Sequence, residues 1–432
     1  MNKKNKSLSV ETQLVHDDPY AEGAIAPPIY QTSLFTFASY QAMVDRYLGD
    51  VHQAVYSRVD NPTNTVLHDK IAALEGGEAA LAFSSGMAAI SNAILSIVRP
   101  GDRVVCIKNV YADTYRLLQG PCARLDIDTV FVDGTDIDDV KQNLPGAKLL
   151  YLESPNTWMF EEQDLATLAK LARAESVLTI ADNSWASPIN QNPLQLGVDL
   201  VVHSATKYIS GHSDTVAGVV TGSKSLIERI DQDVRPYLGA SLSAQDAARL
   251  IRGLRTLPLR IQRHHDSGML IAHKLADHEN VKRVCHPGIQ KQDFSPLRGY
   301  GGLFSFELDG RVDIPTFCNT LELFRLGVSW GGYESLVVPA AVSHSQVGAN
   351  NAAVDFGVPP GMIRLFVGLE DPDDLWDDLE QAFAAATNGR SDSASRHGIS
   401  VFLRRCYHLP RWSSAWSAAQ PCSRWVPSCS LS

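Results

Sequence analysis

The chain has 432 residues, 44% of them apolar and 20% charged, so it can bury a sizeable core and form two or more domains. Its formal net charge of -10 argues against a nucleic-acid or anionic-membrane surface, because both need clustered Lys and Arg. We therefore expect a globular protein whose partners are small molecules.

The first residues, "MNKKNKSLSVETQ", begin with lysines but carry no apolar segment behind them. No stretch reaches the ~18 uninterrupted apolar residues of a membrane helix, so we expect a cytoplasmic protein without a membrane partner. An odd number of cysteines without a C-x-x-C pair indicates neither a zinc ribbon nor a disulfide framework. We expect no metal site and only buried or incidental thiols at the seven cysteines, which are Cys106, Cys122, Cys285, Cys318, Cys406, Cys422 and Cys429.

From about residue 65 to 255, short apolar runs alternate with stretches of helical period. Two helices are indicated by apolar residues on one face, at Leu67, Ile71 and Leu74 and then at Met87, Ile90, Ile94 and Ile97. A third is predicted at "DLATLAKLARAE". Strands buried on both sides are predicted at "RVVCI", "TVFVD", "KLLYLE", "VLTIAD" and "DLVVHS". This alternation predicts an α/β domain over 61–255, with a mostly parallel sheet flanked by helices.

After "RGLRTLPLR", near residue 255, the pattern changes. "LFSFEL" and "MIRLFVGL" are typical of strands, and 313–324 and 373–387 of helices, which predicts a smaller α+β domain over 256–390. The last helix should stop at Asn388-Gly389, a pair suited to a helix C-terminus. Residues 391–432 have no clear period, so we expect a disordered tail and assign it no role.

Polar residues follow several of the predicted strands, and ligands of parallel sheets gather at the carboxyl ends of strands. In "AFSSGMAAI", Gly86 begins a helix, where free backbone N–H groups could hold an anion or the serines could serve as ordinary caps. In "HSATKY", the hydroxyls of Ser204 and Thr206 suit a phosphate and Lys207 suits a carbonyl. A carboxylate about 25 residues before S-x-T-K, with both at strand ends, is the pairing that pyridoxal 5'-phosphate requires.

Each residue type in that pairing has a chemical reason. Lys207 can supply the amine that the cofactor's aldehyde needs. Asp182, at the end of "TIAD", can keep the pyridine nitrogen protonated so that the ring accepts electrons. Tyr111, after "RVVCIKNV", is placed to cover the ring. Ser204, Thr206 and the helix start at Gly86 would bind the phosphate.

Seven motifs over about residues 10–388 resemble the successive signatures of the Cys/Met-metabolism pyridoxal-phosphate enzymes of fold type I. They are "YSRVDNPT", "SSGMAAI", "DNSWASP", "SATKYISGHSD", "RGLRTL", "SWGGYESL" and "IRLFVGLED". The resemblance implies an N-terminal arm over 1–60 and a homotetramer built from dimers. It also implies that Tyr56 and Arg58 reach the phosphate of the neighbouring subunit.

The resemblance implies further contacts within one chain. The main chain of Gly86 and Met87 would touch the phosphate, and Ser329 and Arg364 would hold the substrate α-carboxylate, Arg364 as a two-pronged donor. The γ-acting members commonly have T-N-P after "LESP", whereas this chain has Asn156, Thr157 and Trp158. Either Asn156 or Thr157 could contact the ring hydroxyl of the cofactor.

The motif "SWGGYESL" favours one branch of the family. γ-Acting members carry an acidic residue before S-x-G-G and usually Leu at x, while this chain has Val328 and Trp330 and is similar to the cystathionine β-lyases. The expected reaction is β-elimination of L-cystathionine or a related S-substituted cysteine, giving homocysteine or another thiol, pyruvate and ammonia. Lys207 would remove the α-proton, and Lys207 or Tyr111 would assist the departing sulfur. Alternatives are γ-chemistry on methionine or an acylated homoserine, and a non-catalytic cofactor-binding paralogue.

Overall fold

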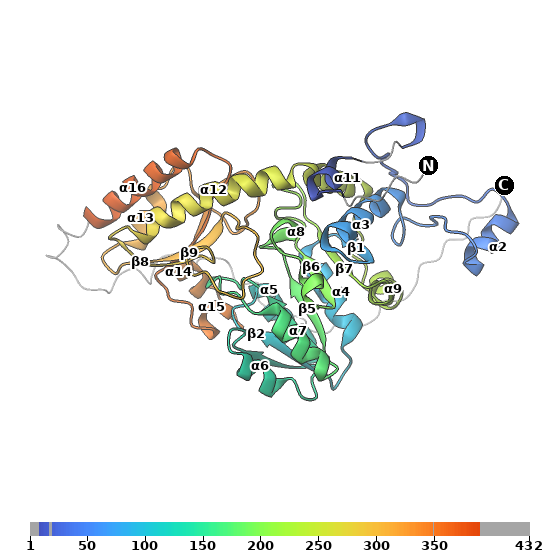
Figure 1. Cartoon of the computed structure of the whole chain (residues 1–432), viewed down its shortest axis with the longest axis horizontal. Helices are drawn as coiled ribbons and strands as arrows, with labels where there is room; N and C mark the ends of the chain where they lie inside the picture. The colour runs from blue at the N-terminus through green and yellow to red at the C-terminus, as the bar shows by residue number, and fades with distance from the viewer. Residues whose placement is uncertain (1–7, 17–19, 349, 389–432) are drawn as a thin grey trace, which may run out of the picture. The chain divides into compact units, whose positions relative to one another are not determined.

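The computed structural model describes residues 8–16, 20–348 and 350–388, which carry two β-sheets (Figure 1). The large sheet has the order β1-β7-β6-β5-β4-β2-β3. Its strands are β1 (Ala79–Phe83), β2 (Arg103–Ile107), β3 (Asp128–Val132), β4 (Leu149–Glu153), β5 (Leu178–Asp182), β6 (Leu200–His203) and β7 (Gly218–Gly222). β7 runs antiparallel to both of its neighbours, and the other neighbouring pairs are parallel. The carboxyl ends of β1, β2, β4, β5 and β6 therefore share one edge.

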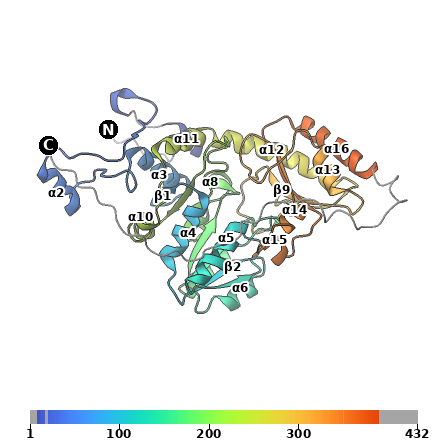
Figure 2. The same ribbon diagram turned by 180° about the vertical axis from the view of Figure 1, so that it is seen from behind.

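Helices cover both faces of this sheet. α7 lies in front of it in Figure 1, and α4 lies in front of it in the reverse view of Figure 2. The helices up to the end of this sheet are α1 (Val10–Val15), α2 (Tyr40–Leu48), α3 (Pro62–Glu75), α4 (Gly86–Ile97), α5 (Ala112–Leu117), α6 (Ile137–Asn143), α7 (Leu165–Ala174) and α8 (Ser187–Asn190). Shorter helical segments are η1 (Ala21–Gly23), η2 (Leu118–Cys122) and η3 (Pro193–Leu196).

The small sheet has the order β10-β11-β12-β9-β8 and is mostly antiparallel. Its strands are β8 (Val281–Cys285), β9 (Leu303–Leu308), β10 (Arg325–Leu326), β11 (Leu336–Pro339) and β12 (Met362–Phe366). The remaining helices are α9 (Lys224–Asp233), α10 (Arg235–Leu238), α11 (Ala244–Arg255), α12 (Leu257–Ala276), α13 (Ile314–Thr320), α14 (Ala340–His344), α15 (Ala352–Asp355) and α16 (Pro372–Asn388). α12 contacts α8 and α11 at one end of its course and β8, β9 and α16 at the other.

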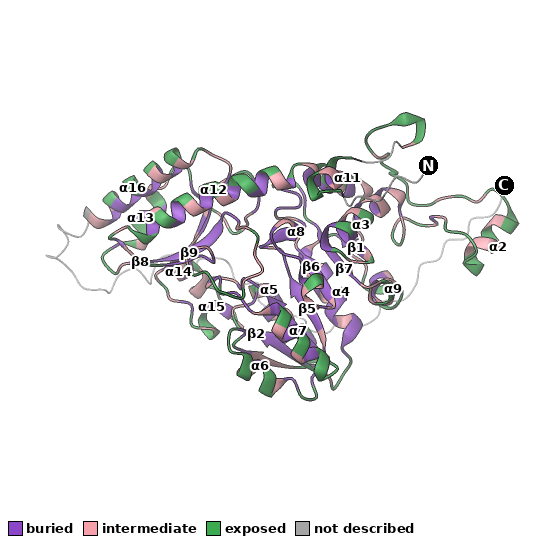
Figure 3. Cartoon of the chain, in the orientation of Figure 1, coloured by how far each residue is buried: buried purple, intermediate pink, exposed green. Residues whose placement is uncertain are grey.

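The predicted α/β class and the smaller α+β part are confirmed, with one correction at a strand. The five predicted strands of the large sheet are β2 to β6. β3 is only partly buried, because it is the edge strand and has a neighbour on one side alone. Figure 3 shows the central strands as buried and much of α2 as exposed. The domain boundaries at 60 and 255 stay predictions.

The prediction of buried thiols is confirmed where the structure describes the residues, because Cys106, Cys122, Cys285 and Cys318 are buried and free. The last helix is described from Pro372 to Asn388, so its predicted stop at Asn388-Gly389 stays a prediction. Among the described residues, no helix combines the length and the apolar character needed to cross a bilayer. The predictions made for residues 391–432 and their cysteines lie outside the described residues.

Candidate active site

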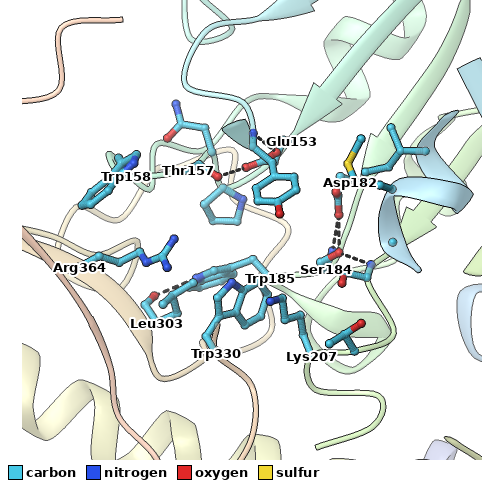
Figure 4. A pocket seen from close by; sticks show the side chains of 18 of the residues that line it. Glu153, Thr157, Trp158, Asp182, Ser184, Trp185, Lys207, Leu303, Trp330 and Arg364 are labelled. Carbon is cyan, nitrogen blue, oxygen red and sulfur yellow. Dashed lines mark hydrogen bonds between the residues drawn. The ribbon is translucent and has the colours of Figure 1, made fainter. Parts of the chain in front are cut away.

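A pocket opens at the shared carboxyl edge of the large sheet and is completed by residues of the small sheet (Figure 4). Lys207 lies there, four residues beyond the end of β6, and its Nζ donates a hydrogen bond to Ser329 Oγ at 2.8 Å. Burial, followed by the positive charge of Arg364, lowers the pKa of Lys207 to about 8. A substantial fraction of this amine is therefore neutral near pH 8, which is the form that acts as a nucleophile or base.

Asp182 is the last residue of β5 and its side chain points into the same pocket (Figure 4). The backbone N and Oγ of Ser184 donate to Asp182 Oδ1 at 2.9 and 2.6 Å. Within the described residues, no hydrogen bond reaches Oδ2 of Asp182. Burial raises the pKa of Asp182, with the hydrogen bonds from Ser184 opposing the rise. A buried carboxylate of this kind is stabilised by a cationic partner, so the position suits a protonated ring nitrogen.

A second buried acid, Glu153, ends β4 and stands opposite Asp182 in the strand register. It accepts hydrogen bonds from Thr157 Oγ1 at 2.6 Å and from the backbone N of Tyr111 at 2.8 Å. Burial, followed by the charge of Asp182, raises the pKa of Glu153 to about 8. Burial and the neighbouring carboxylate thus favour the protonated form of Glu153, and its hydrogen bond from Thr157 holds that side chain at the pocket wall.

The other candidate in this loop, Asn156, is used elsewhere. Its Nδ2 donates to Glu161 Oε2 and its Oδ1 accepts from the Glu161 backbone N, both at 2.9 Å. Both ends of the Asn156 amide are thus committed to one neighbour, whereas the Thr157 hydroxyl bonds to Glu153 inside the pocket. This arrangement favours Thr157 over Asn156 for a polar contact to a ligand.

One end of the pocket is built from small residues and hydroxyls. Ser85 caps α4 by accepting from the backbone N of Ala88, which leaves Gly86 at the first turn of the helix. A Cβ on Gly86 would lie 2.9 Å from the Cβ and Oγ of Ser204, so the close approach of these two loops requires glycine. Met87 and Ser204 also line this end. A helix N-terminus beside a serine hydroxyl suits a phosphate.

Thr206, which is expected to help bind the phosphate, lies at the same end, and its hydroxyl already has partners within the chain. Thr206 Oγ1 donates to the carbonyl of Ala217 at 3.1 Å and accepts from the backbone N of Ala217 at 3.0 Å. The hydroxyl therefore ties the loop after β6 to the segment before β7. A contact from it to a phosphate requires the hydroxyl to turn away from Ala217.

The small sheet contributes a cation to the pocket. Arg364, on β12, donates from Nη2 to the carbonyl of Val328 at 2.8 Å, and its guanidinium lies 5.6 Å from the centroid of the Trp158 ring. Burial lowers the pKa of Arg364 to about 10, which still leaves it charged at neutral pH. Trp330 lies on the neighbouring wall, with its ring centroid 5.3 Å from Lys207 Nζ. A carboxylate next to Arg364 would meet a charged donor backed by an aromatic face.

Tyr111, just before α5, lines the same pocket, and its hydroxyl donates to Asp113 Oδ2 at 3.0 Å. Tyr56 and Arg58 lie outside this pocket of their own chain. Arg58 Nη1 donates to the carbonyl of Pro236 at 2.6 Å, and both residues line a separate hollow with Ser241.

Sequence reasoning passed over several pocket residues. Glu153 could have been found by the rule that identified Asp182, because it also ends a strand of the sheet. Trp158 and Trp185 gave no such signal. Trp185 donates from Nε1 to the carbonyl of Leu303 at 2.8 Å and so joins the large sheet's loops to β9 (Figure 4).

The pocket thus combines an amine, a buried carboxylate, a helix N-terminus beside a serine hydroxyl and aromatic walls, the kinds of group that pyridoxal 5'-phosphate needs. Residues 10–384 match the family of Cys/Met metabolism PLP-dependent enzymes. L-Methionine gamma-lyase of Pseudomonas putida is 38% identical over 401 residues, covering 89% of this chain and 100% of that protein. Cystathionine beta-lyase of Lactococcus lactis subsp. cremoris is 36% identical over 385 residues, covering 87% and 98%.

A solved structure is similar over the same region. Cystathionine gamma synthase from Xanthomonas oryzae pv. oryzae, in complex with cystathionine, matches with a TM-score of 0.82 and 32% identity, covering 88% of this chain and 99% of that one. The chain therefore belongs to the fold type I Cys/Met metabolism PLP-dependent enzymes, a family of carbon–sulfur chemistry on amino acids, and its cofactor is pyridoxal 5'-phosphate.

Proposed function

We propose that the protein is a carbon–sulfur lyase that catalyses β-elimination of L-cystathionine or a related S-substituted cysteine. The products are homocysteine or the corresponding thiol, pyruvate and ammonia. The observation that carries the proposal is the buried Lys207 amine, with its pKa lowered to about 8, in one pocket with Asp182 and Arg364. Such an amine can hold the cofactor and then remove a proton.

Each of these residues has a separate role in the proposed reaction. When bound, the cofactor supplies an aldehyde for the substrate amine and a ring that accepts electrons. Lys207 would hold it through its amine, and the free amine would remove the substrate α-proton. Asp182 keeps the ring nitrogen protonated. Arg364 and Ser329 orient the α-carboxylate, so that the α-proton faces Lys207, and Thr157 is the better placed donor for the ring hydroxyl.

Phosphate binding is assigned to the other end of the pocket. Gly86 and Met87 offer main-chain N–H groups at the start of α4, and Ser204 offers a hydroxyl next to them. Thr206 joins them once its hydroxyl leaves Ala217. Tyr111 covers the ring and assists the departing sulfur.

β-Elimination is favoured over γ-elimination by the two residues that differ from the γ-acting pattern. Val328 is 83% exposed and offers only its carbonyl, which accepts from Arg364. The Trp330 ring lies against Lys207 Nζ, with 5.3 Å between its centroid and the nitrogen. A β-elimination requires Lys207 to reach one carbon of the substrate, whereas a γ-elimination requires proton removal at two. An amine held against an aromatic ring on one side suits the reaction that needs the smaller reach.

γ-Elimination is the second candidate, and a specific observation supports it. L-Methionine gamma-lyase of Pseudomonas putida is slightly more similar to this chain than the lactococcal cystathionine beta-lyase, at 38% against 36% identity. This difference in identity is too small to decide between the two reactions, so the reaction products must be measured.

The products of cystathionine cleavage separate the two candidates. We expect purified holoenzyme to release pyruvate and homocysteine, and a γ-lyase would release 2-oxobutyrate and cysteine. S-Methylcysteine and methionine form a matched pair, since both lose methanethiol and differ by one methylene. We expect S-methylcysteine to be turned over and methionine to react at least about 10-fold more slowly. Release of 2-oxobutyrate as the main oxo acid would refute the β-assignment.

The arm before the cofactor-binding sheet supports the proposal of shared active sites. α2 has no buried residue, although it carries Tyr40, Tyr47 and Leu48 with exposed fractions of 85%, 68% and 71%. A short helix without a packed face is not stable by itself in water. We infer that a second copy of the chain covers this arm in a homo-oligomer, and that Tyr56 and Arg58 then reach the partner's phosphate site.

Mixing two inactive variants tests this sharing. Arg58→Ala and Lys207→Ala should each be poorly active, yet co-refolded dimers of one chain of each hold one site with both residues intact. With random pairing about a quarter of all sites recover, because half of the dimers are mixed. Activity of the mixture, measured as pyruvate release, should therefore exceed the average of the two parents.

The matched control is a mixture of Lys207→Ala and Arg364→Ala. These two residues line one pocket of one chain, so each site of a mixed dimer keeps one defect and no recovery is expected. If the Arg58 mixture recovers no more than this control, despite measured subunit exchange, Arg58 serves its own chain or does not touch the cofactor.

A further inference from the structure

A chain of side-chain hydrogen bonds leads away from Tyr111. The Tyr111 hydroxyl donates to Asp113 Oδ2 at 3.0 Å, and Arg116 Nη1 donates to Asp113 Oδ1 at 2.7 Å. Arg116 Nη2 then donates to Gln346 Oε1 at 2.5 Å. Both carboxylate oxygens of Asp113 are thus engaged. Arg116 therefore holds the Asp113 carboxylate in a fixed orientation from the side opposite Tyr111.

The far end of this chain belongs to a distant part of the sequence. Gln346 follows α14 and lies 230 residues from Arg116 along the chain. A second contact ties α5 to the same region, because the Tyr115 hydroxyl donates to Asp355 Oδ2 at 2.8 Å. The Tyr115 ring also packs edge-on against Phe356, with 5.1 Å between ring centroids. The helix that starts directly after Tyr111 is therefore anchored at two points to the segment around α14 and α15.

The charges around Tyr111 keep its hydroxyl neutral. Burial is the first cause that raises the pKa of Tyr111, and the charge of Asp113 and its hydrogen bond are the next two. Asp182 also raises the pKa of Tyr111, while Arg364 lowers it. Glu153 touches only the Tyr111 backbone N. A neutral phenol has one proton to donate. In this structure the proton is directed at Asp113, and a turn of the hydroxyl toward the pocket would allow it to form a hydrogen bond to a departing sulfur.

We propose that Asp113 is a positioning residue for Tyr111, held in place by Arg116 and Gln346, and that it holds the phenol neutral until its hydroxyl turns into the pocket. This inference rests on the proposed function, in which Tyr111 assists the departing sulfur. Asp113 does not itself line the pocket, and its contact with the lining is the hydrogen bond from Tyr111, so it acts through Tyr111. Arg116 and Gln346 act one step further away.

The experiment measures the ionisation of the Tyr111 phenol in the holoenzyme. Ultraviolet titration of each protein, minus the titration of its Tyr111→Phe counterpart, isolates this one tyrosine. In the wild type we expect no Tyr111 signal up to pH 11. In Asp113→Asn, which keeps an acceptor but loses the charge, and in Asp113→Ala, which loses both, the phenol should titrate toward its ordinary value of about 10.

Turnover gives a second readout. For Asp113→Ala we expect kcat for S-methylcysteine to fall about 10-fold, with KM changed less than about twofold, because a partly exposed charge-assisted hydrogen bond is lost. Asp128→Asn is the matched control. It removes a similar Asp–Arg pair, with Arg103 at 3.1 Å on the sheet edge, and should leave both readouts unchanged.

The outcomes separate this inference from the proposed reaction. If Tyr111 titrates in neither Asp113 variant below pH 11, or if Asp128→Asn shifts it equally, the positioning role is overturned. If Tyr111 titrates earlier in the Asp113 variants while cystathionine yields no pyruvate, the positioning role stands and the β-elimination fails. Gln346→Ala should give a smaller loss of kcat than Asp113→Ala, and a larger loss would contradict the order of the contacts.

Discussion

Replacing Lys207 with Ala is expected to abolish catalysis and to remove the yellow colour of the holoenzyme. The variant lacks the amine that holds the cofactor covalently and removes the α-proton, and loss of a general base alone costs roughly 10²–10⁴-fold in rate. We therefore expect pyruvate release from S-methylcysteine to fall by at least about 10³-fold. Visible absorption spectra and kcat give the two measurements.

The matched control for this variant is Lys224→Ala. Lys224 lies at the start of α9, with 73% of its side chain exposed and a weak ion pair to Glu228 at 3.8 Å. It should keep both colour and activity. An unchanged visible spectrum in Lys207→Ala, in a protein that remains folded by circular dichroism, would remove the central assignment.

Replacing Arg364 with Ala is expected to spare the cofactor and weaken substrate use. The guanidinium faces the pocket from β12, away from the phosphate end, so the variant should stay yellow. Loss of a charge-assisted hydrogen bond of ~1.5–3 kcal/mol to the substrate carboxylate corresponds to about a 10- to 150-fold fall in kcat/KM. The kcat/KM of Arg364→Lys should lie between those of the wild type and Arg364→Ala, because lysine keeps the charge without the two-pronged donor.

The control for the arginine is Arg283→Ala in the same small sheet. Arg283, on β8, pairs with Glu307 at 2.7 Å, so its loss tests whether removing any strand arginine disturbs the sheet. We expect kcat/KM of Arg283→Ala to remain within about twofold of the wild type. Full activity of Arg364→Ala would exclude the carboxylate role.

The sheet could be predicted in part from sequence. Central strands such as β4 and β5 are covered on both faces, so they form continuous apolar runs that are easy to identify. The order of the strands in the sheet could not be predicted in this way. β7 is a short run between glycines, and its insertion between β1 and β6 depends on tertiary pairing that periodicity does not encode. The exposure of β3 follows from the same order.

The residues of the candidate active site could also be predicted only in part. Lys207 and Asp182 could be identified because their chemistry and their positions at strand ends coincide. The relation of Glu153 to Asp182 required the knowledge that β4 and β5 are neighbours. The contact between Arg116 and Gln346 joins loops 230 residues apart, which a single sequence without aligned relatives does not reveal.

The 20-residue helix α12 gives the molecule a mechanical property. Its length is about 30 Å, and its backbone hydrogen bonds make it a stiff lever between the large sheet and the small one. Thr256, which ends α11 and precedes α12, is the non-helical joint at its base. A rotation of about 5° at this joint would displace the far end by roughly 2–3 Å. Small torsional changes at Thr256 would thus be amplified into adjustments of the distance between Arg364 on the small sheet and Lys207 on the large one.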